Sequence, residues 1–301
     1  MSNGYIDLNF RGSARVIATA VLAGTDGVTL IDPGPTSCLP ALEAGLRDQG
    51  LSLRDVRNVL LTHIHLDHAG AAGTIAERVP GLRVFVHERG AAHMIDPAKL
   101  LASATRLYGE HMDLLWGAFQ PVPADRVTVL TGGERLELGG AFLKVAYTPG
   151  HAKHHVSYLD EHTGVAYVGD TAGVQVSGTY LIAPTPPPDI DIEAWQQSLD
   201  TIEAWQPVSL FLTHFGPVSP AKAHLTRIRA TVATAAENAR ELLKGGGTDE
   251  ELSKRFAEQM RKDVRRELPE HEAKAAELAA PFDQLWGGLS RYWAKKVASS
   301  K

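Results

Sequence analysis

The chain has 301 residues, of which 44% are hydrophobic and 22% are charged, and this composition excludes an intrinsically disordered or fibrous protein. The formal net charge of -5 argues against a general nucleic-acid binder, which would carry a basic excess. The 13 histidines stand beside a single cysteine, Cys38, so an intramolecular disulfide framework and a thiolate-rich metal cluster are both excluded. Any metal in this protein must therefore be held by imidazole and carboxylate groups.

The first seven residues contain neither a basic segment nor an apolar stretch of the kind that a signal peptide needs. No later run of the sequence reaches the roughly 18 apolar residues that a membrane span requires. We therefore expect a cytoplasmic protein with no membrane partner and no nucleic-acid partner.

The first part of the chain predicts two short strands, over 15–22 and 28–31, separated by a Gly-Thr-Asp-Gly hairpin turn. A helix is predicted over 39–49, a buried strand over 56–61 and another strand over 82–86. The next forty residues hold many apolar and aromatic side chains without a strand pattern. We expect this stretch to be helical.

Short strands return from Val127, over 127–130, 135–138, 142–147, 156–159 and 165–168, between glycine-rich turns. A proline-rich loop over 184–188 precedes a helix from about Ile192 and a strand over 208–212. Beyond Pro220 the chain is predicted to be helical, with breaks at the glycines 245–247 and at Pro269 that give three helices. These elements predict an α/β protein with two packed sheets covered by helices on both outer faces.

The strongest motif is Thr-His-Ile-His-Leu-Asp-His-Ala-Gly over 62–70, where the strand ending at Leu61 gives way to a predicted helix. Residues two apart in extended backbone point to the same side, so His63 and His65 can reach one metal. Asp67 and His68, at the turn into the helix, can face a second. The alternative interpretation is a cluster of polar residues on a surface loop.

Three further apolar strands end in the same way. The strand over 142–147 leads to His151, the strand over 165–168 to Asp170, and the strand over 208–212 to His214. Layered α/β proteins usually build their ligand sites at strand tips. Four such endings therefore favour a ligand site over ordinary core packing.

Together with Asp32 in Ile-Asp-Pro-Gly, these motifs resemble, over residues 15 to 220, the metallo-β-lactamase-fold hydrolase superfamily, in its glyoxalase II-like or lactonase-like branch. The resemblance implies a four-layer αβ/βα sandwich with a dinuclear metal site at the sheet edge. It also implies a ligand set: His63, His65 and His151 for one metal, Asp67, His68 and His214 for the other, Asp170 bridging them, and Asp32 orienting a ligand histidine.

By the same resemblance we expect a catalytic domain over residues 1–220 and a C-terminal helical extension over 221–301 that packs on it. The extension is similar in layout to the helical addition of glyoxalase II-type thioesterases. No glutathione-binding residues can be carried over to this sequence.

Five neutral imidazoles and two carboxylates suit Zn²⁺ and tolerate Fe²⁺ or Mn²⁺, so we expect two divalent ions, with zinc favoured. Divalent ions lower the pKa of a bound water to about 7 and so supply a hydroxide nucleophile at neutral pH. Asp67 is the candidate catalytic residue that accepts or passes on the proton. The positive charge left at such a site favours an anionic substrate.

Two stretches are expected to shape a partly apolar substrate pocket. One is the helical insert over 88–119, which contains Tyr108, and the other is the segment over 173–191, which contains Tyr180. His155 is a third candidate pocket residue, because it follows His151 closely. Core packing and a structural role are the competing interpretations for these residues.

The sequence thus predicts a metal-dependent hydrolase of a small-molecule ester-type bond, with thioester, lactone or carboxylic ester ahead of phosphodiester. β-Lactam hydrolysis is a less favoured alternative. Another alternative is a mononuclear iron oxygenase that resembles persulfide dioxygenases, although the complete second ligand set argues against it. A third is a ligand-binding or signalling protein with weak catalysis. The sequence leaves the oligomeric state open.

Overall fold

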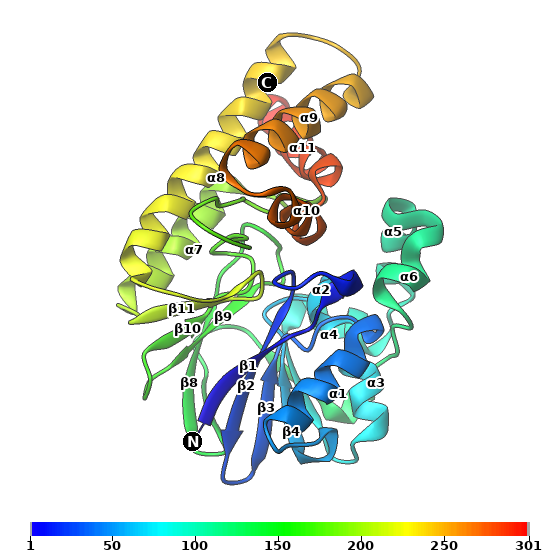
Figure 1. The fold of residues 1–301 in the computed structure, drawn as a ribbon, viewed down its shortest axis with the longest axis vertical. Coiled ribbons are helices and arrows are strands. Elements are labelled where there is room, and N and C mark those ends of the chain that lie inside the picture. The colour runs from blue at the N-terminus through cyan, green and yellow to red at the C-terminus, as the bar shows by residue number, and fades with distance from the viewer. Residues whose placement is uncertain (1, 300–301) are drawn as a thin grey trace.

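Two six-stranded sheets form the centre of this computed structural model, which describes residues 2–299 (Figure 1). The strands of the first sheet, in spatial order, are β1 (Ser2–Asp7), β2 (Ala18–Gly24), β3 (Gly27–Ile31), β4 (Val56–Leu60), β5 (Arg83–His87) and β6 (Val127–Leu130). The first three pair antiparallel, and β3 to β6 pair parallel. The carboxyl ends of β3, β4 and β5 therefore lie at one edge of the sheet.

The second sheet has the spatial order β12-β11-β10-β9-β8-β7. Its strands are β7 (Arg135–Leu138), β8 (Ala141–Tyr147), β9 (Val156–Asp160), β10 (Val165–Tyr167), β11 (Ser209–Leu212) and β12 (Gly216–Val218). All neighbours pair antiparallel except β10 and β11, which are parallel. Since β8 and β10 both run antiparallel to β9, the carboxyl ends of β8, β10 and β11 also share one edge.

Alternate strand residues fill the space between the two sheets, as the period of two in a strand requires. In β2, Ala18, Ala20 and Leu22 pack inward, while Val21 between them belongs to the core beneath the helices. Inward residues of the second sheet include Leu143, Val145 and Tyr158. This alternation gives each sheet two apolar faces, so helices must cover the outer ones.

Helices cover the outer face of each sheet (Figure 1). The first sheet carries α1 (Leu39–Asp48), α3 (Ala72–Arg78) and α4 (Glu88–Ile95), with the single turn α2 (Leu66–Ala69) at its edge, and the second sheet carries α7 (Ile192–Ala204) and α8 (Ala221–Lys244). In α1, for example, Leu39, Leu42 and Leu46 form a buried stripe at helical spacing. The predicted αβ/βα sandwich is confirmed.

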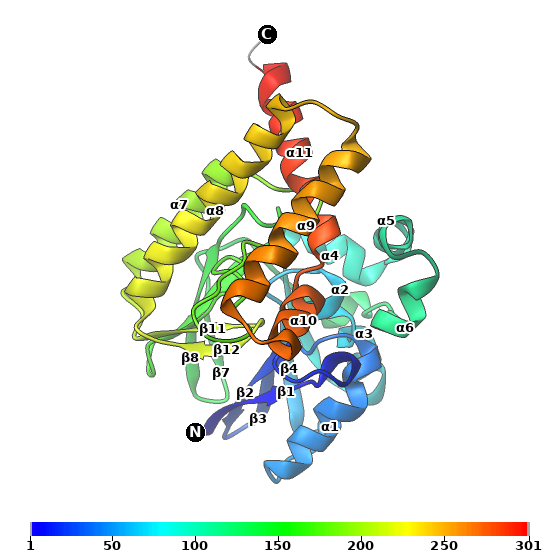
Figure 2. The same cartoon turned by 45° about the horizontal axis from the view of Figure 1, so that its top comes forward.

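The helical insert consists of α5 (Ala98–Tyr108) and α6 (Met112–Trp116), and the chain ends with α9 (Asp249–Glu267), α10 (Glu270–Ala279) and α11 (Phe282–Ser299). Short 3₁₀ turns occur at Phe10–Gly12, Thr36–Cys38, Leu53–Asp55, Gly109–His111 and Ala124–Arg126. Figure 2 shows α5 on one side of the sheet edge and α9 to α11 on the other. None of the described helices is long and apolar enough to cross a membrane.

Two features differ from the sequence predictions. The sequence pattern assigns no element to the residues before 15, and in the structure β1 pairs with β2 along its whole length. It is an edge strand with an exposed Tyr5 and a buried Ile6, so its backbone hydrogen bonds hold it without a strong apolar pattern. The C-terminal region has four helices instead of three, because Pro281 separates α10 from α11. The division of the chain at residue 220 stays a prediction.

Candidate metal centre

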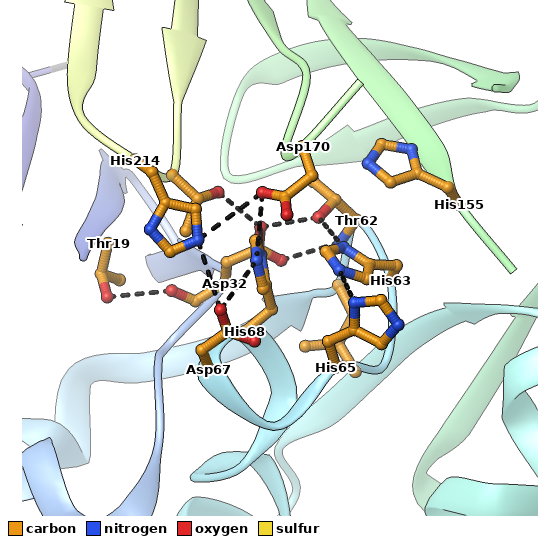
Figure 3. Close-up of polar contacts among 12 residues, drawn as sticks. Thr19, Asp32, Thr62, His63, His65, Asp67, His68, His155, Asp170 and His214 are labelled. Atoms are coloured by element: carbon orange, nitrogen blue, oxygen red, sulfur yellow. Dashed lines mark hydrogen bonds and ion pairs between the residues drawn. The ribbon is translucent and has the colours of Figure 1, made fainter. Parts of the chain in front are cut away.

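The sequence-predicted ligands lie together at the edge shared by the two sheets (Figure 3). His63 and His65 follow β4, Asp67 and His68 lie in α2, His151 follows β8, Asp170 follows β10, and His214 follows β11. Rigid strands from both sheets thus bring side chains from four parts of the chain to one place.

Three imidazoles, His63, His65 and His151, form what we call the imidazole group. The Nδ1 atom of His65 lies 2.9 Å from Nε2 of His63 and 3.0 Å from Nε2 of His151. The three ring nitrogens therefore converge on one point, as the ligands of a single ion must.

Asp67, His68 and His214 form a second set, which we call the mixed group. The Oδ2 atom of Asp67 lies 3.3 Å from Nε2 of His214 and 3.7 Å from Nε2 of His68. Asp170 spans both groups: its Oδ2 lies 3.4 Å from Nε2 of His151, and its Oδ1 lies 3.3 Å from Nε2 of His68. Each carboxylate oxygen of Asp170 thus faces a different group.

Several buried polar atoms at this centre have no hydrogen-bond partner. They are Nε2 of His68, Nε2 of His214 and Oδ1 of Asp170. Leaving such a group unsatisfied costs about 1–3 kcal/mol, and these three atoms all point at the same small space. A divalent cation there would satisfy all of them, so the donor set fits the metal centre that the sequence predicts.

The histidine pKa values of the two groups are shifted in opposite directions. Burial, together with the neighbouring imidazoles, holds the pKa values of His63 and His65 well below the usual range, and burial also lowers the pKa of His151. In the mixed group, burial is outweighed by the carboxylates: Asp67, Asp170 and Asp32 raise the pKa of His68 well above its usual value. The imidazole group is therefore neutral, and the mixed group holds protons when no metal is bound.

The carboxylates of the centre stay ionised. Although burial favours the neutral form, His68 and His214 lower the pKa of Asp67 to about 2, and the charges of nearby histidines hold the pKa of Asp170 well below its usual range. Burial also opposes protonation of His214, but Asp170 and Asp67 raise its pKa. The centre as a whole attracts positive charge.

Asp32 orients His68 of the mixed group through a network of buried hydrogen bonds. It accepts hydrogen bonds from the backbone N–H of Thr62 at 2.8 Å, the Thr62 hydroxyl at 2.7 Å, the Thr213 hydroxyl at 2.8 Å and Nδ1 of His68 at 2.8 Å. Its backbone carbonyl accepts from Thr19. Because Nδ1 of His68 donates to Asp32, Nε2 is left free to bind a metal. The structure thus places Asp32 where the resemblance implied.

Backbone carbonyls hold two other histidines in the same way. Nδ1 of His151 donates to the carbonyl of Pro184 at 2.8 Å, and Nδ1 of His214 donates to the carbonyl of Val16 at 2.6 Å. Both rings therefore present Nε2 to the centre.

A close approach of α7 supports the loops that carry His151 and Asp170. Gly150 has a φ of +134°, and a Cβ at this position would lie 2.3 Å from Cα of Trp195. The indole N–H of Trp195 donates to the carbonyl of Thr171 at 2.7 Å. Only glycine fits at position 150, and one helix fixes both loops.

The centre forms the floor of a cavity of about 480 Å³. Tyr108 of α5 lines this cavity, and so does Gln284 of α11. Burial raises the pKa of Tyr108 above its usual range. The helical insert and the C-terminal helices therefore both contribute to the lining of the cavity above the metal ligands.

The structure places the other two predicted pocket residues elsewhere. His155 is buried behind the centre, where its ring stacks on His63 with 5.1 Å between centroids and its Nδ1 lies 2.9 Å from the Thr148 hydroxyl. Tyr180 lines a separate cavity of about 1000 Å³ between α8 and α9. The segment turns away because Val174 and Ile182 pair with each other, and its later residues, Pro184, the prolines 186–188 and Asp189, return to the cavity of the metal centre.

Three residues without a predicted role, Arg89, His93 and Lys99, line the metal cavity. Arg89 and His93 lie four residues apart in α4, which places them on one face of the helix. That spacing was the available signal, but the sequence does not show which face meets the cavity.

Two mixed sheets between helical layers, with clustered histidines and aspartates at their common edge, define the αβ/βα sandwich class of metal-binding proteins. The sequence model of the metallo-beta-lactamase superfamily matches residues 13–214, and the chain belongs to that superfamily. The resemblance inferred from the motifs is confirmed at this level.

Individual relatives match only part of their own length. The chain is 32% identical over 165 residues to the metallo-beta-lactamase fold-containing protein ST1585 of Sulfurisphaera tokodaii, which covers 54% of this chain and 61% of that protein. It is 28% identical over 151 residues to a hydroxyacylglutathione hydrolase of Synechococcus sp. (strain JA-2-3B'a(2-13)), covering 50% of this chain and 47% of that enzyme.

The solved structure of ST1585 from Sulfolobus tokodaii superposes with a TM-score of 0.69, covering 96% of this chain and 98% of that chain at 20% identity. At this identity the likeness shows the fold alone, and here the fold includes the C-terminal helices.

Proposed function

We propose that this protein is a dinuclear metal-dependent hydrolase of a small-molecule ester-type bond, with thioesters as the first candidates and lactones and carboxylic esters next. The observation that supports it is the pair of ligand groups that share Asp170 on the floor of a cavity of about 480 Å³. The superfamily is generally hydrolytic, and one relative is a hydroxyacylglutathione hydrolase, whose name describes hydrolysis of a thioester.

The imidazole group would hold one divalent ion and the mixed group the other, with zinc favoured and Fe²⁺ or Mn²⁺ compatible with the same ligands. When bound, such ions activate water at neutral pH and polarise the bond under attack. The chain itself fixes the ligands, because Asp32, Pro184 and Val16 hold the far nitrogens of His68, His151 and His214.

Asp67 is the residue that we propose as the proton carrier. It lines the cavity, its side chain is 22% exposed, and its pKa of about 2 keeps it ionised at neutral pH. Asp170 is 6% exposed and lies between the two groups, so its role is to hold them together. Of the two carboxylates, only Asp67 is open enough to exchange a proton with a substrate.

The test combines metal quantification with a hydrolysis panel of thioesters, lactones, aryl esters, phosphodiesters and a chromogenic cephalosporin. The proposal expects two divalent ions per chain and a clear preference for thioesters or other carboxylic esters. One iron per chain with oxygen consumption would instead indicate an oxygenase, and preference for the cephalosporin would indicate a β-lactamase. A metal-loaded protein that turns over none of the compounds would indicate a binding protein.

The proposal includes a cytoplasmic location and a small-molecule substrate, without a nucleic-acid or membrane partner. The net charge of -5 supports the exclusion of nucleic acid. Fractionation of cells expressing the full chain tests the location, and a partner found at a membrane would contradict it.

A further inference from the structure

The metal cavity has one apolar wall that comes mainly from α5. Leu100, Ala104, Leu107 and Tyr108 line it at positions i, i+4, i+7 and i+8, which form one face of a helix. Across the cavity lie Ala279–Pro281 and Leu285 from the C-terminal helices. No side chain of α5 is fully buried; Leu100, Ala104 and Tyr108 pack partly against the core and also line the cavity.

A second wall is basic. Arg89 in α4, Lys99 in the first turn of α5 and Lys153 just after His151 all line the cavity. Arg89 and Lys153 also line a smaller cavity of about 380 Å³ that adjoins the first. Cationic side chains from three parts of the chain therefore gather on one side of the space above the metal ligands.

Two of these cations have no carboxylate partner. Lys153 pairs with Asp189, with 3.2 Å between Nζ and Oδ1. Arg89 and Lys99 form no ion pair with any of the residues 2–299 that the structure describes, and the guanidinium of Arg89 lies over the ring of Tyr147 at 5.8 Å. The stacking on Tyr147 restricts where this guanidinium can point.

The acidic residues of the cavity do not neutralise Arg89 and Lys99. Three carboxylates line it: Asp67 and Asp170 face the histidines of the metal centre, and Asp189 pairs with Lys153. Arg89 and Lys99 thus add two positive charges, without an ion-pair partner among residues 2–299, to the lining of the cavity that also holds Asp67 and Asp170. Such a surface attracts an anionic group and orients it.

We propose that Arg89 and Lys99 form a subsite for a carboxylate that the substrate carries away from the bond that is cleaved, joined to it through an apolar segment lying against α5. The inference rests on the proposed function and names the substrate class of that same site: a thioester or ester with a terminal carboxylate. The planar guanidinium of Arg89 can bind a carboxylate through two N–H groups, and Lys99 adds a point charge. In the hydrolysis, water adds across the acyl bond to give an acid and a thiol or alcohol, and the distal carboxylate is unchanged.

The experiment uses the full chain loaded with Zn²⁺ and two pairs of thioesters. Within a pair the compounds differ only in ending in a carboxylate or in the neutral carboxamide; in one pair this end is on the thiol part and in the other on the acyl part. We expect the wild type to hydrolyse the carboxylate of at least one pair with a kcat/KM about tenfold higher, a difference that corresponds to about 1.4 kcal/mol. Arg89→Gln and Lys99→Gln should each reduce this preference severalfold, through a higher KM for the carboxylate compound.

The matched control is Arg106→Gln, which removes an exposed positive charge from the same helix at a position that does not line the cavity. It should keep the preference, and circular dichroism and bound zinc, measured on every variant, report that each is folded. Equal hydrolysis of both members of each pair by the wild type would overturn the inference and leave the proposed function standing. Persistence of the preference in the Arg89→Gln/Lys99→Gln double variant would also overturn it. Failure of the wild type to hydrolyse any of the four compounds would contradict thioesters as its substrates and overturn the inference, while the hydrolysis panel described above tests the proposed function separately.

Discussion

The imidazole group and the mixed group share Asp170 and lie side by side, yet their histidines differ in protonation when no metal is bound. His63 and His65 are kept neutral, since burial and mutual repulsion lower their pKa values. Although burial opposes it, Asp67, Asp170 and Asp32 raise the pKa of His68, and Asp170 and Asp67 raise the pKa of His214, so both histidines favour the protonated form. Two metal positions built from similar side chains are therefore expected to differ in affinity and in their response to pH.

This difference has a simple chemical origin. A metal at the imidazole group replaces nothing, whereas a metal at the mixed group must displace protons from His68 and His214. The carboxylates attract protons and metal ions alike, so the mixed group can remain charge-balanced in either state.

The largest effect should come from Asp170→Ala, because Asp170 is the side chain common to both groups. We expect loss of bound metal at both positions and a fall in turnover of about a thousandfold or more, since the electrostatic arrangement of the site is lost. Metal analysis and rate measurement on the same sample check this. A variant that keeps its metal and its activity would contradict the ligand assignment.

Removing one histidine from each group sharpens the comparison. His151→Ala and His214→Ala should each reduce the metal content from about two ions per chain to about one, and the ion that remains should differ in affinity between the two variants. The control is His271→Ala, since the His271 side chain is 82% exposed and lies far from the centre in sequence. Identical affinities in the two ligand variants would show that the groups are equivalent.

A smaller effect is expected from Asp32→Asn, which retains the shape of the side chain but replaces one acceptor oxygen with a donor. Four donors converge on this carboxylate, so one of them will be left unsatisfied. We expect metal affinity to fall by about 10–100-fold and the free energy of unfolding by about 1–3 kcal/mol. Chelator competition and urea unfolding measure the two quantities, and Asp26→Asn, at an exposed turn, is the control. An unchanged affinity would mean that His68 needs no support from Asp32.

The smallest effect is a difference in proton release. The raised pKa values of His68 and His214 mean that zinc entering the mixed group at pH 7 releases protons, and its affinity should fall by up to about tenfold per displaced proton for each pH unit below these pKa values. The lowered pKa values of His63 and His65 predict little release from the imidazole group. Calorimetry in two buffers of different ionisation enthalpy, on His151→Ala and His214→Ala, separates the groups. Equal proton release from both variants would contradict the electrostatic difference.

The same shifts set the stability of the metal-free protein. The raised pKa values of His68 and His214 contribute stability that is fully present below about pH 6.5 and is lost as pH rises through their folded-state values. The lowered pKa values of the imidazole group act in the opposite direction, because unfolding lets these histidines take up protons below about pH 6.5. In chelator-treated protein, a free energy of unfolding that falls as pH rises would show that the mixed group determines the pH dependence. A free energy of unfolding that rises with pH would show that the imidazole group determines it.

The arrangement of the centre could be predicted because each candidate ligand directly follows an apolar strand. His151, Asp170 and His214 are found by locating where β8, β10 and β11 end, and strand ends are marked in the sequence by glycine and by polar residues. Local signals of this kind do not depend on how distant elements pack.

The features that escaped prediction do depend on distant packing. Tyr180 follows Asp170 by ten residues in the sequence, but the pairing of Val174 with Ile182 directs it toward α8 and α9. The contact of Trp195 with Gly150 and the cavity-facing side of Arg89 arise from helices folding back over the sheet edge. The residue pattern within a single helix or strand does not specify contacts between elements that are distant in the sequence.

The helix α5 has a consequence for how this protein can diversify. Its 11 residues include no fully buried side chain, while they form much of the wall above the metal ligands. Exchanging its cavity-lining residues therefore removes partly buried side chains only, which costs less burial energy than an exchange of fully buried strand residues. Substitutions in this short helix, in evolution or in design, can therefore change substrate specificity without altering the metal ligands.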